Sequence, residues 1–207
     1  MSEHSPHDLI DQLGPIDIYL FDQILRGRIT ANMRILDAGC GRGRNLVYLL
    51  GIGADVFAVD SDRDNIEGIR TLARRLSPAL PADQFRAEPL DGLSFPDAAF
   101  DVVLCNAVLH FMKDEAEFRA VLDQLFRVLR AGGLFFSRLA STIGIEQQVR
   151  REQGRWHSLP DGTSRFLVDE AFLAEETRRV GATLADPLKT TVVQNQRSMT
   201  TWVLRKD

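Results

Sequence analysis

The sequence has little of what would mark a secreted or membrane protein. Its 207 residues include only two cysteines, too few for a disulfide framework or for a four-thiolate metal site. No apolar run approaches the ~18 residues that a membrane span needs. The N-terminal stretch MSEHSPHDLIDQ has neither the basic nor the apolar region of a secretory signal. We therefore expect a cytoplasmic protein with reduced thiols and no membrane span.

The sequence also has no excess of basic residues. It contains 29 Asp and Glu against 25 Lys and Arg, for a formal charge of −4, which argues against a nucleic-acid partner. Hydrophobic residues make up 44% and charged residues 26%, the balance of an ordinary globular chain. The length favours a single domain with a full core. Nothing in the sequence indicates an oligomeric state.

Short apolar runs alternate with helical patterns along the chain, which is typical of a parallel sheet covered by helices. The pattern predicts a doubly wound, Rossmann-like α/β fold, with a seven-stranded, mostly parallel sheet and helices on both faces. The expected strands are 34–38, 55–60, 84–87, 100–107, 134–139, 183–188 and 200–204. The expected helices are 44–50, 62–76, 114–129 and 169–180, with further helical stretches in the first 30 residues.

A glycine-rich turn follows the first expected strand, in Asp37-Ala38-Gly39-Cys40-Gly41-Arg42-Gly43. Glycines there let the backbone approach a ligand closely. Asp60 ends the second strand, 21 residues after Gly39, where a carboxylate can accept hydrogen bonds from both ribose hydroxyls. The alternatives are a tight strand-helix connection and a helix N-cap at Asp60, and neighbouring residues can divide these two roles.

The spacing argues against two nucleotide classes. A dinucleotide fingerprint needs a third glycine at position 44, where the chain has Arg44. No G-x-x-x-x-G-K-[ST] sequence is present, which excludes a P-loop.

Four stretches resemble class I S-adenosylmethionine-dependent methyltransferases. ILDAGCGRGRN and VFAVDSD resemble the first two motifs, and LSFPDAAFDVVLCNAVLHF resembles the fourth-strand region. FRVLRAGGLFF resembles the following helix and strand, with Ala131 in place of the usual proline. The resemblance covers about residues 30–140. The GRGRN variant is similar, more weakly, to the tellurite-resistance type of methyltransferase.

This resemblance implies that S-adenosylmethionine is the cofactor and S-adenosylhomocysteine the product. It implies roles for residues at the carboxyl ends of the strands. Asp37, Gly39, Cys40 and Gly41 would lie by the methionine part, Asp60 and Ser61 by the ribose, and Leu90 against the adenine. The acid at the adenine maps to Glu88, which we prefer, or to Asp91. Asn106 would face the amino-acid part of the cofactor or the reacting centre.

Methyl transfer needs nucleophile, methyl group and sulfur in line, and a general base helps only when the acceptor is protonated. His110, just after the fourth strand, is the candidate base, and the alternative is a packing histidine beside Phe111. His4 and His7 fall in the N-terminal tail, and His157 falls in a polar segment. No cluster of metal ligands is visible, so we expect no metal.

The polar segment 141–166 follows the fifth strand, where an acceptor would enter. We expect it to cover the substrate, the alternative being a surface helix without substrate contact. Its arginines weakly favour an anionic small-molecule acceptor. The candidate substrate residues are Tyr19, Arg138, Trp156 and Arg165, and Arg138 has the alternative of a surface ion pair.

These expectations divide a single methyltransferase domain, 1–207, into four parts. They are an N-terminal helical cap (1–30), a cofactor-binding core (31–140), the substrate cover (141–166), and a C-terminal helix with the final strands (167–207). Cys40 and Cys105 are expected near the cofactor as small buried side chains rather than as a redox switch. The competing functions are a non-catalytic S-adenosylmethionine-binding protein and, less favoured, a dinucleotide-dependent oxidoreductase.

Overall fold

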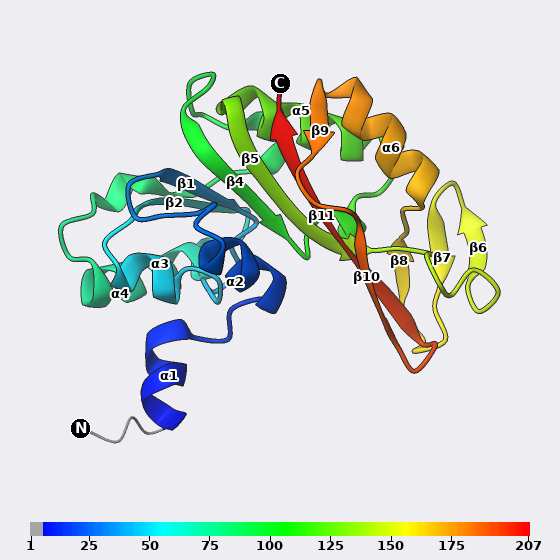
Figure 1. Cartoon of the computed structure of the whole chain (residues 1–207), viewed down its shortest axis with the longest axis horizontal. Helices are drawn as coiled ribbons and strands as arrows, with labels where there is room; N and C mark the ends of the chain where they lie inside the picture. The colour runs from blue at the N-terminus through cyan, green and yellow to red at the C-terminus, as the bar shows by residue number, and fades with distance from the viewer. Residues whose placement is uncertain (1–5) are drawn as a thin grey trace.

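A computed structural model describes residues 6–207 and contains a central twisted sheet (Figure 1). Its strand order is β10-β11-β5-β4-β1-β2-β3, and β9 pairs with β11 off this path. The first five strands in sequence are mutually parallel, and the C-terminal strands pair antiparallel. The strands are β1 (Arg34–Ala38), β2 (Asp55–Asp60), β3 (Phe85–Ala87), β4 (Phe100–Asn106), β5 (Leu129–Ala140), β9 (Ala182–Leu184), β10 (Lys189–Val193) and β11 (Arg197–Lys206).

Four of the α-helices begin at aspartates whose side chains accept backbone N–H groups, which satisfies donors that a helix start leaves unpaired. Asp17, Asp62, Asp114 and Asp169 have this role in α2, α4, α5 and α6. The α-helices are α1 (Pro6–Leu13), α2 (Ile18–Leu25), α3 (Val47–Gly51), α4 (Arg63–Leu76), α5 (Glu115–Val128) and α6 (Glu170–Arg179). The 3₁₀ turns are η1 (Ala82–Gln84), η2 (Leu90–Gly92) and η3 (Leu109–Phe111).

Alternate side chains of the central strands enter two separate cores, because successive strand residues point to opposite faces. On one face, Leu36 and Val103 pack with α5 and α6. On the other, Ile35 and Leu104 pack with α2, α3 and α4. The predicted doubly wound sheet, covered by helices on both faces, is confirmed.

The segment 141–166 is more regular than expected. It contains a separate antiparallel sheet, with β6 (Arg150–Gln153), β7 (Trp156–Ser158) and β8 (Ser164–Phe166) in that order. The alternative of a surface helix is therefore wrong, and the role of the segment as a substrate cover stays a prediction. Its strands are too short and polar to give a strand pattern in the sequence.

Several predicted boundaries were wrong. The expected strand 183–188 overlaps only β9, which ends at Leu184, and a further strand, β10, begins beyond it at Lys189. The connection between them contains Pro187, which cannot donate to a sheet ladder. The expected helix 44–50 begins only at Val47, because residues 40–46 form turns around Gly43, whose φ is +79°. β5 begins at Leu129, five residues before the expected 134. Within residues 6–207, no helix combines the length and apolar character needed to cross a membrane.

Candidate cofactor and acceptor sites

The glycine turn after β1 is held against β2 by its backbone. The N–H groups of Gly39 and Cys40 both donate to the Val59 carbonyl, at 2.8 and 3.1 Å. Gly39 has a φ of +76°, and a Cβ there would lie 2.4 Å from the Val108 side chain. Only glycine therefore fits at position 39, and the turn and the segment after β4 can approach closely.

Asp60, at the end of β2, braces the same turn. One carboxylate oxygen accepts from the Gly41 N–H at 2.8 Å, and the other accepts from the Asp62 N–H at 2.9 Å and from Asn65 at 3.2 Å. Asp62, not Asp60, is the N-cap of α4. The capping role thus falls to a neighbour, and the half-buried Asp60 carboxylate remains at the pocket described next.

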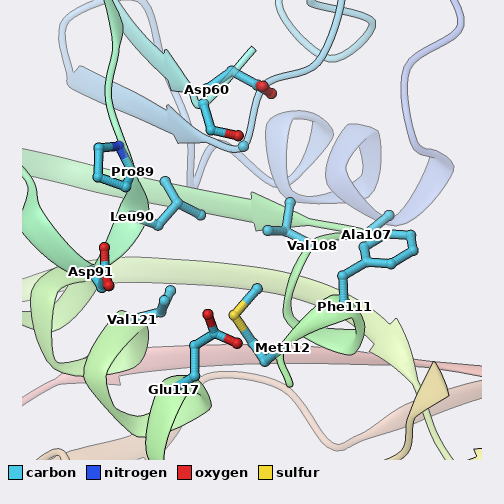
Figure 2. Close-up of a pocket in the computed structure, with 12 residues that line it drawn as sticks. Asp60, Pro89, Leu90, Asp91, Ala107, Val108, Phe111, Met112, Glu117 and Val121 are labelled. Atoms are coloured by element: carbon cyan, nitrogen blue, oxygen red, sulfur yellow. The ribbon is translucent and has the colours of Figure 1, made fainter. Parts of the chain in front are cut away.

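A pocket of about 490 Å³ opens at the carboxyl ends of β1, β2 and β4 (Figure 2). In Figure 2, Asp60 lies on one side of the cavity and Glu117 and Met112 on the other. We call it the first pocket. It is lined by Gly39, Asp60, Ser61, Pro89, Leu90, Asp91, Ala107, Val108, Phe111, Met112, Glu117 and Val121.

The two candidate adenine acids are placed differently. Asp91 lines the first pocket, whereas Glu88 is not among its lining residues. The Glu88 carboxylate instead accepts hydrogen bonds from the backbone and hydroxyl of Ser94, at 3.2 and 2.6 Å. This geometry favours Asp91 over our preferred Glu88.

Asp37 and Asn106 form a buried polar pair on neighbouring strands. Asp37 on β1 is in register with Leu104 on β4, so Asn106, two residues further, projects from the same face. One Asp37 oxygen and both side-chain polar atoms of Asn106 have no hydrogen-bond partner among the described residues. Burial raises the pKa of Asp37 from 3.8 to about 7, opposed by the positive charge of Arg44. Unpaired buried polar groups of this kind are suited to a polar ligand.

A second pocket of about 350 Å³ adjoins the first and shares one lining residue with it, Ala107. Ala107 has a φ of +62°, and its N–H donates to the Arg138 carbonyl at 2.9 Å. The second pocket is lined by Ala107, His110, Arg138, Ala140, Leu159, Asp161, Thr163, Arg165, Val193, Arg197, Ser198 and Met199. Its walls come from the ends of β4 and β5, from the segment 141–166, and from the hairpin of β10 and β11.

His110 is buried in the turn η3 and lines the second pocket, while its neighbour Phe111 lines the first. The His110 Nδ1 accepts a hydrogen bond from the Ala140 N–H at 3.2 Å. Burial, followed by the positive charge of Arg165, lowers the pKa of His110 to about 4. The imidazole is therefore neutral at pH 7, and its single proton is on Nε2.

Arg138 connects the second pocket to α2. Its guanidinium donates to Asp17 at 3.3 Å and lies over the Tyr19 ring, 5.4 Å from the centroid. The Tyr19 hydroxyl in turn bonds to Thr191 of β10 at 2.8 Å. Arg138 thus does form the ion pair of the alternative interpretation, but with the buried Asp17 rather than at the surface. Tyr19 supports Arg138 but is not itself among the residues that line the pocket.

The other two candidate substrate residues, Arg165 and Trp156, lie in different places. Arg165 lines the second pocket and lies over the Phe111 ring at 5.0 Å. Trp156 lies elsewhere, since its indole N–H donates to the Met112 and Lys113 carbonyls and anchors β7 beside α5. Cys40 and Cys105 are buried free thiols in different cores, and burial raises the pKa of both. Neither lines either pocket.

Sequence reasoning missed the contribution of the C-terminal hairpin. Arg197 and Met199 of β11 line the second pocket although they lie about 90 residues beyond Ala107. An antiparallel strand returning beside β5 carries no motif, so no local signal could have placed these residues. Asp161 and Thr163 were within the expected cover but were not singled out.

Comparison with known proteins agrees with the resemblance in the sequence. Residues 36–137 match the family model described as "Methyltransferase domain". The ubiquinone biosynthesis O-methyltransferase of Methylocella silvestris is 37% identical over 105 residues, which are 51% of this chain and 39% of that protein. The corresponding protein of Acinetobacter baumannii (strain AYE) is 26% identical over 195 residues, covering 89% of this chain and 77% of that one. The chain spans about half or less of the first curated relatives that it matches.

Solved structures share the fold. The 1,6-didemethyltoxoflavin-N1-methyltransferase of Burkholderia thailandensis, solved with 1,6-didemethyltoxoflavin and S-adenosylhomocysteine, has a TM-score of 0.71 at 24% identity. The match covers 97% of this chain and 81% of that one. The similarity to the tellurite-resistance type stays a prediction. Residues 36–137 belong to the methyltransferase domain family, within the class I S-adenosylmethionine-dependent superfamily, and the cofactor of this domain is S-adenosylmethionine.

Proposed function

We propose that this protein transfers the methyl group of S-adenosylmethionine to a small anionic acceptor. The observation that carries the proposal is the junction of two pockets at Ala107. The first pocket is lined by Gly39 of the glycine turn and by Asp60, and the second is lined by three arginines and one aspartate. A cofactor in the first pocket and an acceptor in the second would meet at this residue, which gives the alignment that methyl transfer requires.

The proposed roles follow the two pockets. Asp60 and Ser61 bind the ribose, and Leu90 and Asp91 contact the adenine. Asp37, Gly39, Cys40, Gly41 and Asn106 surround the methionine part, with Cys40 contributing its backbone. His110, Arg138 and Arg165 contact the acceptor. Tyr19 and Trp156 act at a distance, by holding Arg138 and β7 in place.

Binding and turnover test separate parts of this proposal. Calorimetry with S-adenosylhomocysteine should give micromolar affinity, and no binding to the folded protein would refute the proposal. Release of S-adenosylhomocysteine across a panel of small acceptors distinguishes an enzyme from a non-catalytic binding protein. A change in NADH or NADPH fluorescence on mixing would instead favour an oxidoreductase.

We also propose that residues 1–207 act as one domain, with a helical cap at 1–30, a cofactor core at 31–140, an acceptor cover at 141–166 and a C-terminal part at 167–207. The four lining residues that 141–166 gives to the second pocket support its role as cover. The net charge of −4 supports an acceptor other than nucleic acid. The chain has only two cysteines, and both are free thiols, which supports action in the reducing environment of the cytoplasm.

A further inference from the structure

The second pocket has an excess of positive charge, because three arginines and only one carboxylate, Asp161, line it. Arg165 and Arg197 make no ion pair within residues 6–207, and Arg138 shares its charge with Asp17 at 3.3 Å. Arginine presents planar, paired N–H donors that match the two oxygens of a carboxylate. At about 350 Å³ the pocket is at the small end of the range for ligand sites. It therefore suits a small molecule with a carboxylate group.

His110 cannot take a proton from the acceptor. A neutral imidazole has one nitrogen with a free lone pair, and in His110 this is Nδ1, which already accepts from Ala140 at 3.2 Å. The other nitrogen, Nε2, carries the ring proton. It makes no hydrogen bond within the described residues, so His110 offers the pocket a donor and no base.

Asp161 is the only carboxylate among the lining residues of the second pocket, and it is a weak base. One of its oxygens accepts from both the backbone and the hydroxyl of Thr163, at 3.0 and 2.6 Å. These bonds, with the charges of Arg197 and Arg165, hold its pKa below the usual value. Besides its three arginines, which stay protonated, His110 and Asp161 are the titratable side chains that line the pocket, and neither is available to deprotonate an alcohol or a phenol.

We propose that this pocket takes a small carboxylate and that the methyl group is transferred to a carboxylate oxygen, forming a methyl ester. The inference rests on the proposed function. A lone pair of the ionised carboxylate forms the new O–CH₃ bond, the C–S bond of the sulfonium breaks, and its electron pair stays on sulfur. The products are a neutral ester and neutral thioether, and no proton has to leave. Arginines and the His110 Nε2–H hold the carboxylate, and a lone pair that they leave free on one oxygen attacks the methyl group.

The acceptor test uses matched sets of probes. Each small carboxylate, for example benzoate, is assayed beside its primary amide and its sulfonate, with S-adenosylhomocysteine as readout. We expect turnover with carboxylates alone, competitive inhibition by sulfonates, and products that release methanol in mild base. Turnover only with amines, phenols or alcohols, or no turnover of any carboxylate by protein that binds the cofactor, overturns the inference. Failure to bind the cofactor overturns the proposed function as well.

A second test concerns His110 and the arginines. With a carboxylate acceptor and saturating cofactor, kcat should stay constant between about pH 6.5 and 9. Arg165→Gln should raise the acceptor KM at least tenfold, and His110→Gln, which keeps an N–H donor, should retain more activity than His110→Leu. His157→Gln is the matched control, because His157 bonds to the Arg155 carbonyl outside the pocket. Nitrogen NMR should find the His110 proton on Nε2. A proton on Nδ1, or a kcat that rises with the titration of a base, overturns the inference.

Discussion

Asp37 should make the stability of the free protein depend strongly on pH. This carboxyl is completely buried in β1, and burial raises its pKa from 3.8 to about 7. Between these values the folded protein holds a proton that the unfolded chain has released. Stability therefore falls as pH rises through this window. At ~1.4 kcal/mol per pH unit, the full cost above pH 7 is about 4 kcal/mol.

The perturbation is Asp37→Asn, which keeps the shape of the side chain and removes its titration. Integrating the same linkage, wild-type protein should lose about 2–3 kcal/mol of unfolding free energy between pH 5 and pH 8 through this group. The variant should lack this loss. The unfolding free energy of Asp37→Asn minus that of the wild type should therefore increase by about 2–3 kcal/mol from pH 5 to pH 8. Urea unfolding without cofactor, at several pH values, measures it. Asp55→Asn, at a partly exposed carboxylate on β2 that pairs with Arg34, is the control, and its stability should change with pH as that of the wild type does.

Cofactor binding should depend on pH in the opposite direction. The ammonium group of S-adenosylmethionine favours an ionised carboxylate nearby, so affinity should rise as pH increases toward 7 and binding should release a proton. Calorimetry in buffers of different ionisation enthalpy detects that release. Parallel unfolding curves for wild type and Asp37→Asn, together with no proton release, would refute the reasoning about Asp37.

The sequence was most informative for features that depend on residues close together in the chain. The alternation of strands and helices predicted the doubly wound sheet, and the glycines with Asp60 predicted where its ligand edge lies. Both signals are local, because a buried parallel strand is continuously apolar and a tight turn needs glycine. The division of roles between Asp60 and its neighbour Asp62 was left open by the sequence and needed hydrogen bonds to resolve it.

The acceptor side could not be predicted to the same depth. Its residues come from η3, β5, the segment 141–166 and β11, and only long-range pairing brings them together. The tautomer of His110 depends on the Ala140 N–H, 30 residues away, so the sequence could propose a base where the structure presents a donor. The same limit applies to Trp156, whose indole N–H is satisfied by carbonyls more than 40 residues earlier.

Three further changes test how the two pockets divide the work. Asp60→Ala should weaken cofactor binding by roughly 2–4 kcal/mol and also lower stability, because it removes hydrogen bonds to the glycine turn as well as to the ribose. Its control, Asp62→Ala, loses the N-cap of α4 and should cost about 1 kcal/mol of stability with near wild-type affinity in calorimetry. Replacing residues 147–158 by a Gly-Ser linker removes β6 and β7 but keeps the buried Ile145 and Leu159. The first pocket takes no lining residue from the segment 141–166, whereas the second takes four, so cofactor affinity should stay within several-fold while acceptor turnover is lost. Normal turnover by the folded, shortened protein would show that the segment is not the acceptor cover, and loss of cofactor binding would show that the cofactor site extends into it.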